Sequence, residues 1–167
     1  MPGVKIAPMK KYAILMCCMG NICRSPTAEG VLRAKLQVAG LADRVELDSA
    51  GTHDYHVGRA PDARSQRHAL QRGYDLSALR ARQVELADLQ RFDLVLAMDQ
   101  ANMAALRRLH PEVSPDKLRL LMSFATVHRV EEVPDPYYGE GGGFERVLDY
   151  IEDACDGVIA MLQRQLA

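Results

Sequence analysis

The amino-acid sequence predicts an α/β fold in which helices cover both faces of an open parallel β-sheet. Two observations predict this fold: short apolar runs of strand length recur along the chain, and segments with apolar residues at helical spacing separate them. Strands that alternate with helices in this way pair in parallel, because each helix carries the chain back across the sheet. The 167 residues contain no internal repeat and no linker, so one domain is expected.

The first predicted strand is the nearly continuous apolar run Tyr12–Cys18, which is typical of a strand that is buried on both faces. A helix is expected over residues 26–39, because proline suits a first helical turn and apolar side chains follow at helical spacing. Ser25, just before this helix, is a favourable N-cap residue. Residues 1–11 are expected to be a flexible leader, so that the single domain covers residues 12–167.

The later elements follow from the same two patterns. Alternating apolar and polar side chains predict a second strand at Val45–Ala50. The turn-rich stretch 51–61 after it is expected to form one wall of a binding site. Asp99 is expected to cap a helix at 100–109. The remaining predictions are helices at 62–72, at 85–90 and from 143 to near the C-terminus, with strands at 93–98 and 117–122.

Composition and charge exclude several functional classes. The formal net charge is -1, from 21 basic and 22 acidic residues, so no basic field would concentrate nucleic acid. No apolar run approaches the roughly 18 residues of a membrane span and the start lacks a signal-peptide pattern, so a cytoplasmic protein without a membrane span is expected. The four cysteines are too few for a disulfide framework and lack the spacing of a zinc site, which predicts reduced thiols and no metal or other cofactor.

The most unusual loop, CMGNICRS at Cys18–Ser25, leaves the carboxyl end of the first strand, where open parallel sheets bind their ligands. Its cysteine and arginine are separated by five residues, so the backbone N–H groups between them can form a cup around a tetrahedral oxyanion. Gly20 and Asn21 suit the left-handed backbone conformations that closing such a cup requires. A phosphate-like anion is therefore expected in the site, bound by the loop residues Met19, Gly20, Asn21, Ile22, Cys23 and Ser25.

Several side chains of this loop have predictable roles. Arg24 can donate two parallel hydrogen bonds to phosphate oxygens, a geometry that lysine does not reproduce. The N–H donors, the helix N-terminus and the guanidinium favour the thiolate of Cys18, and Ser25 can donate a hydrogen bond to that sulfur. Alternation along the strand directs Cys17 to the opposite face, into the core. Cys23 can either pack inertly or form a protective disulfide with Cys18 under oxidation.

With these residues the chain closely resembles the low-molecular-weight protein tyrosine phosphatases, from Tyr12 to the last helix. The matching segments are CMGNICRSPTAEG at 18–30, DSAGT at 48–52, ARQV at 81–84, LAMDQAN at 96–102 and PDPYYG at 134–139. The resemblance implies a three-layer sandwich, with a four-stranded parallel sheet flanked by helices on both faces. It also implies metal-independent hydrolysis of phosphotyrosine in proteins, in two steps through a phosphocysteine intermediate.

The resemblance assigns roles to five residues by their positions in these segments. Cys18 matches the nucleophile, Arg24 the phosphate clamp and Ser25 the hydroxyl that assists the sulfur. Asn21 matches the amide that organises the loop. Asp135 matches the general acid, and its two flanking prolines would present it rigidly to the departing phenolate and then to water.

Further expectations concern the walls of the site and the partners. Aromatic side chains can contact the ring of phosphotyrosine, namely Tyr55, His56, Tyr137 and Tyr138, and Met19 can form part of the floor. A phosphate cup at the bottom of a deep apolar slot would select phosphotyrosine over the shorter phosphoserine. A histidine that often supports the loop asparagine in the family has no counterpart here, so Ser49 is expected to hold that asparagine. The tyrosine-rich rim is compatible with a monomer or a weak dimer.

Three alternatives remain open. An arsenate reductase of the same fold shares the cysteine-arginine cup, but it needs further cysteines to resolve the arsenic adduct, and residues 77–92 contain none. Cys155 lies on the apolar face of the last helix and is expected in the core. A phosphoarginine phosphatase would carry threonine where this loop has Ile22, so isoleucine favours tyrosine. A module that only binds phosphopeptides would need neither Cys18 nor Asp135.

Overall fold

Four parallel strands form the central sheet of this computed structural model, which describes residues 10–137 and 142–167. Their order across the sheet is β2-β1-β3-β4, which confirms the predicted four-stranded parallel sheet. The strands are β1 (Tyr12–Cys18), β2 (Val45–Gly51), β3 (Leu94–Ala97) and β4 (Leu118–Leu120). Residues 1–9 of the predicted leader lie outside the described residues.

Helices connect the strands close to the positions that the sequence predicts. The α-helices are α1 (Arg24–Val38), α2 (Ala63–Gln71), α3 (Leu86–Arg91), α4 (Gln100–Leu109) and α5 (Gly142–Gln165). Short 3₁₀ helices are η1 (Ala42–Arg44) and η2 (Leu121–Phe124). In the part of the chain that the structure describes, no helix is both long enough and apolar enough to cross a bilayer.

Two local predictions are wrong. α1 begins at Arg24 with Cys23 in the N-cap position, so Ser25 lies in the first helical turn and does not cap the helix. The predicted strand at 117–122 is shorter, because the chain turns into η2 at Leu121. That turn buries Leu121, Met122 and Phe124 in the same hydrophobic core as α5.

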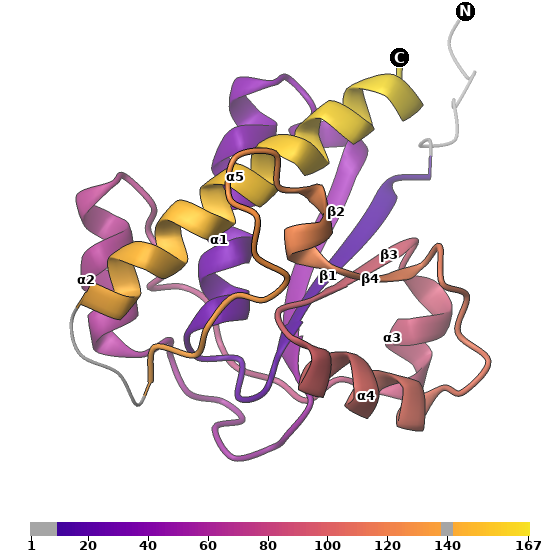
Figure 1. The fold of residues 1–167 in the computed structure, drawn as a ribbon, viewed down its shortest axis with the longest axis horizontal. Coiled ribbons are helices and arrows are strands. Elements are labelled where there is room, and N and C mark those ends of the chain that lie inside the picture. Colours follow the sequence, from indigo (N-terminus) through magenta and orange to yellow (C-terminus); the bar gives the residue numbers. More distant parts are fainter. Residues whose placement is uncertain (1–9, 138–141) are drawn as a thin grey trace, which may run out of the picture.

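Side-chain alternation along β1 divides the interior into two hydrophobic cores, one on each face of the sheet. Ile14 and Met16 pack with the apolar faces of α1 and α5. Leu15 and Cys17 point the other way and pack with α3 and α4. Figure 1 shows the resulting three layers, with α1, α2 and α5 on one side of the sheet and α3 and α4 on the other.

The topology of the sheet positions the site at the carboxyl end of β1. β1 lies between β2 and β3, so the chain first crosses from β1 to β2 on one side and then returns past β1 to β3 on the other side. Ligands of open parallel sheets bind where the strand order reverses in this way. Cys18 ends β1 and pairs with Gly51 at the end of β2. A side chain on Gly51 would start 2.8 Å from the backbone oxygen of Met19, so glycine allows the loop after β1 to pass close to β2.

Candidate active site

The loop after β1 surrounds the sulfur of Cys18 with hydrogen-bond donors. The backbone N–H of Asn21 points to Sγ at 3.3 Å, and the hydroxyl of Ser25 lies 3.0 Å from it. Cys18 is 3% exposed, so little water competes for these contacts. α1 begins at Arg24, directly after the loop, so the positive end of the helix dipole lies beside the same sulfur. The N–H of Asn21, the hydroxyl of Ser25 and the start of α1 thus all lie beside the atom that is expected to act as the nucleophile.

The shape of the loop depends on one left-handed residue. Asn21 has a φ of 57°, the conformation that the sequence predicts for this residue type. Gly20 does not have a positive φ, so the prediction of a left-handed Gly20 is wrong. A side chain at residue 20 would not fit, because its Cβ atom would lie 2.9 Å from Cδ2 of His56. Glycine therefore lets the loop touch the wall of the pocket.

The side-chain amide of Asn21 ties the loop to two neighbouring segments. Nδ2 donates to the hydroxyl of Ser25 at 2.8 Å and to that of Ser49 at 3.0 Å. Oδ1 accepts the backbone N–H of Arg82 at 3.0 Å. The structure thus brings Ser49 of β2 to the asparagine that it is expected to support. The backbone of Arg82 is a second support, which sequence analysis missed because it carries no side-chain signal.

Arg24 is held by groups from two distant segments of the chain. Nη1 donates to Oδ2 of Asp99 at 2.6 Å and to the backbone oxygen of Val133 at 3.0 Å, and Nη2 lies 3.6 Å from Oδ2 of Asp135. Burial of the guanidinium opposes its charge, but the negative groups of Cys18 and Asp99 outweigh burial and raise the pKa of Arg24 above its usual value. A cation that is fixed in this way is suited to binding a phosphate.

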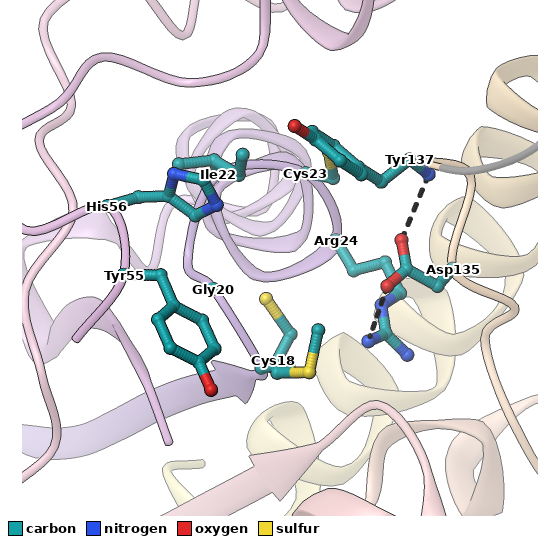
Figure 2. Close-up of a pocket in the computed structure, with 10 residues that line it drawn as sticks. Cys18, Gly20, Ile22, Cys23, Arg24, Tyr55, His56, Asp135 and Tyr137 are labelled. Carbon is teal, nitrogen blue, oxygen red and sulfur yellow. Dashed lines mark hydrogen bonds and ion pairs between the residues drawn. The ribbon is translucent and has the colours of Figure 1, made fainter. Parts of the chain in front are cut away.

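Asp135 lies in the segment between η2 and α5, beside Arg24 and across the pocket from Tyr55 (Figure 2). Oδ1 accepts the backbone N–H of Tyr137 at 3.0 Å, an Asx turn that orients the carboxyl group. Oδ2 is the oxygen that faces Arg24. The side chain is 29% exposed, so the carboxyl group reaches both the buried cation and the open pocket.

A pocket opens over Cys18. Figure 2 shows Tyr55 and His56 on one side of it, with Asp135, Arg24 and Tyr137 on the other. Its lining residues are Cys18, Met19, Gly20, Ile22, Cys23, Arg24, Tyr55, His56, Asp135 and Tyr137. The predicted site residues that do not line it are Asn21, Ser25 and Ser49, which are buried and hydrogen-bonded to the loop. Residues 138–139 of the matching PDPYYG segment lie outside the described residues.

The other three thiols have surroundings that oppose ionisation. Burial raises the pKa of Cys17 and of Cys155 above the usual thiol value, and it raises the pKa of Cys23 to about 12. Cys17 and Cys155 are 0% exposed and pack in the two cores, as the sequence predicts. All four cysteines are free thiols. A disulfide between Cys18 and Cys23 stays a prediction.

Two acidic residues of the site, Asp99 and Glu29, were not predicted as site residues from the sequence. Asp99 caps α4, as predicted, by accepting the backbone N–H of Asn102 at 2.8 Å, but its other carboxylate oxygen also binds Arg24. Its place just after β3, beside the carboxyl end of β1, is the signal that could have found it. Glu29 accepts the hydroxyl of Ser49 at 2.7 Å and is buried within α1, which no pattern in the sequence indicates.

The parallel sheet and the pocket over Cys18 are those of an α/β protein with a cysteine-arginine loop after its first strand. The family model described as low molecular weight phosphotyrosine protein phosphatase matches residues 13–167. The low molecular weight protein-tyrosine-phosphatase of Streptomyces coelicolor is 44% identical over 158 residues, which cover 93% of this chain and 96% of that protein. The chain therefore belongs to the low molecular weight phosphotyrosine protein phosphatase family.

Solved structures agree with this assignment. The crystal structure of a protein tyrosine phosphatase from Entamoeba histolytica, with Hepes in the active site, matches with a TM-score of 0.89 at 39% identity and covers 94% of this chain and 100% of that chain. The crystal structure of YfkJ from Bacillus subtilis also matches with a TM-score of 0.89, at 32% identity, and covers 96% of this chain and 100% of that chain. The likeness thus extends over almost the whole length of both chains.

Proposed function

We propose that this protein hydrolyses phosphotyrosine in proteins, through a phosphocysteine at Cys18 and without a metal ion. The observation that carries the proposal is that Cys18, Arg24 and Asp135 line one pocket. The Streptomyces coelicolor relative is named as a protein-tyrosine-phosphatase, which supports the same activity here. The proposal includes a cytoplasmic location, where thiols stay reduced, and a monomer or weak dimer.

In the first proposed step, the thiolate of Cys18 attacks phosphorus, and the bond between phosphorus and the phenolic oxygen breaks. Asp135, carrying a proton, donates it to the departing oxygen, so that tyrosine leaves as a neutral phenol. Arg24 and the N–H groups of the loop bind the non-bridging oxygens, where negative charge grows in the transition state. Nη2 of Arg24 lies 3.6 Å from Oδ2 of Asp135, so the clamp and the acid lie close to each other.

In the second proposed step, water attacks the phosphorus of phosphocysteine and gives a proton to the Asp135 carboxylate. The bond between phosphorus and sulfur breaks, and its electron pair returns to Cys18 as the thiolate. The hydroxyl of Ser25 and the backbone N–H of Asn21 lie against this sulfur and stabilise it as the leaving group. Inorganic phosphate then leaves the cup.

The rim of the pocket supports an aromatic substrate. Tyr55 is 68% exposed and Tyr137 is 38% exposed, and both line the pocket above the cup. Such rings can pack against the ring of phosphotyrosine, whose length brings its phosphate to the floor. Ile22 presents only hydrocarbon to the pocket, which argues against phosphoarginine as the substrate.

Hydrolysis of aryl phosphates in the presence of a metal chelator tests the proposal. Wild-type protein is expected to hydrolyse phenyl phosphate and p-nitrophenyl phosphate and to be inhibited by vanadate. Cys18→Ser removes the nucleophile and is expected to leave no measurable turnover. Asp135→Ala is expected to lower kcat for phenyl phosphate by about 10²-fold, and by less for the better leaving group, because the acid protonates the leaving oxygen.

Asp116→Ala is the matched control for Asp135→Ala, because Asp116 is an exposed aspartate in the loop before β4 and does not line the pocket. Its turnover is expected to equal that of wild type. Full activity of Cys18→Ser would refute the covalent mechanism. Consumption of thiol that depends on arsenate would instead identify a reductase.

A further inference from the structure

A series of hydrogen bonds connects the surface of α1 to the loop asparagine. Arg33 lies on α1, one turn after Glu29, and its Nη2 donates to Oε2 of Glu29 at 2.7 Å. The other carboxylate oxygen, Oε1, accepts the hydroxyl of Ser49 at 2.7 Å. Ser49 in turn accepts from Nδ2 of Asn21 at 3.0 Å. Neither Glu29 nor Arg33 lines the pocket, and the mechanism above uses neither of them.

The ion pair accounts for a carboxylate in the interior. Glu29 is 4% exposed, and a buried carboxylate is costly unless it is paired and hydrogen-bonded. Arg33 supplies the positive charge while half of its side chain stays in water. The same Nη2 also donates to the backbone oxygen of Leu47 at 3.1 Å, which holds the guanidinium against β2.

The carboxylate determines the direction of the hydrogen bond at Ser49. A carboxylate can only accept, and a serine hydroxyl has a single hydrogen, so that hydrogen lies between Ser49 and Glu29. The oxygen of Ser49 can then only accept a hydrogen bond from Asn21, so the NH₂ group of the Asn21 amide must face Ser49. Its oxygen consequently points to the backbone N–H of Arg82, where an acceptor is required.

The donor and acceptor roles that Glu29 imposes continue from Asn21 through Ser25 to the sulfur of Cys18. The second N–H of the Asn21 amide donates to the oxygen of Ser25 at 2.8 Å. Because that oxygen accepts from Asn21, the one hydrogen of Ser25 is free for the sulfur of Cys18, 3.0 Å away. Ser25 is 0% exposed, so water offers no alternative partner. The hydroxyl therefore donates to the sulfur.

We infer that Glu29 and Arg33 are positioning residues, which act through Ser49 and Asn21 to make Ser25 a hydrogen-bond donor to the Cys18 sulfur. The inference rests on the proposed function, because a donor at sulfur matters most when phosphocysteine breaks down and negative charge returns to that atom. The hydrogen bond accelerates the first step less, because a donor that stabilises the thiolate also makes it a weaker nucleophile. Loss of the ion pair should therefore slow the second step selectively.

Rapid-mixing kinetics with p-nitrophenyl phosphate test the inference on the full-length protein. In Glu29→Met and Arg33→Met, kcat is expected to fall about tenfold, the scale of one hydrogen bond to a charged group. Phosphocysteine should accumulate, so that a burst of nitrophenol approaching one per protein molecule precedes steady turnover. The inhibition constant of inorganic phosphate should change less than twofold, because the cup itself stays formed.

Two further variants complete the test. Arg33→Lys keeps a cation beside Glu29 and is expected to restore kcat. Arg91→Met removes an exposed arginine from an ion pair with Glu46 on another part of the surface, and its kinetics should equal those of wild type. Arg33 and Arg91 are similarly exposed, so the comparison separates the position of the arginine from its loss.

Three outcomes would overturn the inference. Wild-type kcat in both Glu29→Met and Arg33→Met would show that the ion pair has no effect on the Cys18 sulfur. Alternatively, kcat and phosphate affinity could fall together without a burst, which would indicate a general loosening of the loop. A wild-type protein without turnover would remove the proposed function as well, whereas the first two results leave it intact.

Discussion

At the scale of single residues, the four cysteines differ because their surroundings differ. Cys18 lies on the pocket with an N–H and a hydroxyl against its sulfur. Cys23 also lines the pocket, but burial raises its pKa to about 12, so it stays protonated at neutral pH. Cys17 and Cys155 are enclosed in the cores, where burial raises their pKa as well. A reagent that alkylates thiolates should therefore react with these cysteines at different rates.

Iodoacetate is expected to label this protein once, at Cys18. With a pKa of about 12, the thiolate fraction of Cys23 is roughly one in 10,000 at pH 8, so it should not react on the same time scale. The raised pKa favours the thiol at every pH below that value, so a change from pH 7 to pH 9 should add no second label. Mass spectrometry of the digested protein measures the sites.

Two controls test whether the label is on Cys18 in the pocket. Inorganic phosphate should protect Cys18, and Cys18→Ser should remain unlabelled. A second label on Cys23 at a comparable rate would contradict the expected protonation of this thiol. Labelling of Cys17 would mean that the core around α3 and α4 opens in solution.

At the scale of elements, one arginine joins the N-terminus of α2 to the segment that carries Asp135. Asp62 caps α2 by accepting the backbone N–H of Arg64 at 2.8 Å, and it also binds the Arg64 guanidinium. Burial opposes the charge of Asp62, but these hydrogen bonds outweigh burial and lower its pKa. Arg64 then donates to the backbone oxygen of Tyr137 at 3.2 Å and lies over its ring.

Arg64→Ala is expected to impair proton donation by Asp135, because the segment that carries Asp135 loses this contact with α2. We expect kcat to fall about tenfold for phenyl phosphate and less for p-nitrophenyl phosphate, since the poorer leaving group depends more strongly on the acid. Steady-state kinetics with both substrates measure the difference. Arg67→Ala, an exposed arginine on the same helix, is the matched control. An equal loss for both substrates would contradict this role of Arg64.

At the scale of the whole molecule, α5 covers the sheet face that carries α1 and crosses η2 at close range (Figure 1). Gly157 makes this crossing possible, because a Cβ atom there would lie 1.8 Å from the backbone oxygen of Phe124. Gly30 in α1 faces a side chain that can move, since an added Cβ atom would lie 2.3 Å from the end of the flexible Leu76 side chain. The two glycines should respond differently to the same substitution.

Gly157→Ala is expected to lower the free energy of unfolding by about 2 kcal/mol or more, although alanine favours a helix by about 1 kcal/mol over glycine. For a domain of this size the melting temperature should fall by roughly 4 to 8 °C. Gly30→Ala should lower the free energy of unfolding by less, because the Leu76 side chain can move aside. Thermal unfolding measures both variants. A Gly157→Ala protein as stable as wild type would show that η2 is free to move away from α5.

Local patterns predicted most of the architecture. Apolar runs and helical spacing placed the four strands and the five α-helices of the described chain, because each pattern reflects burial on one or two faces of a single element. They failed where a long-range contact overrides the local preference. Ser25 is a favourable cap by type, yet its hydroxyl is used by Asn21 and Cys18 in the first turn of α1.

The cysteine, the arginine and the loop between them are contiguous, so their spacing alone indicates which residues could carry the chemistry. The contacts that hold these residues in place depend on the three-dimensional packing. The partner of Arg24 is Asp99, 75 residues away, and the carboxylate that orients Ser49 comes from α1, 20 residues away. Such pairings depend on how the elements pack, and packing is set by the whole core, so no local pattern records them.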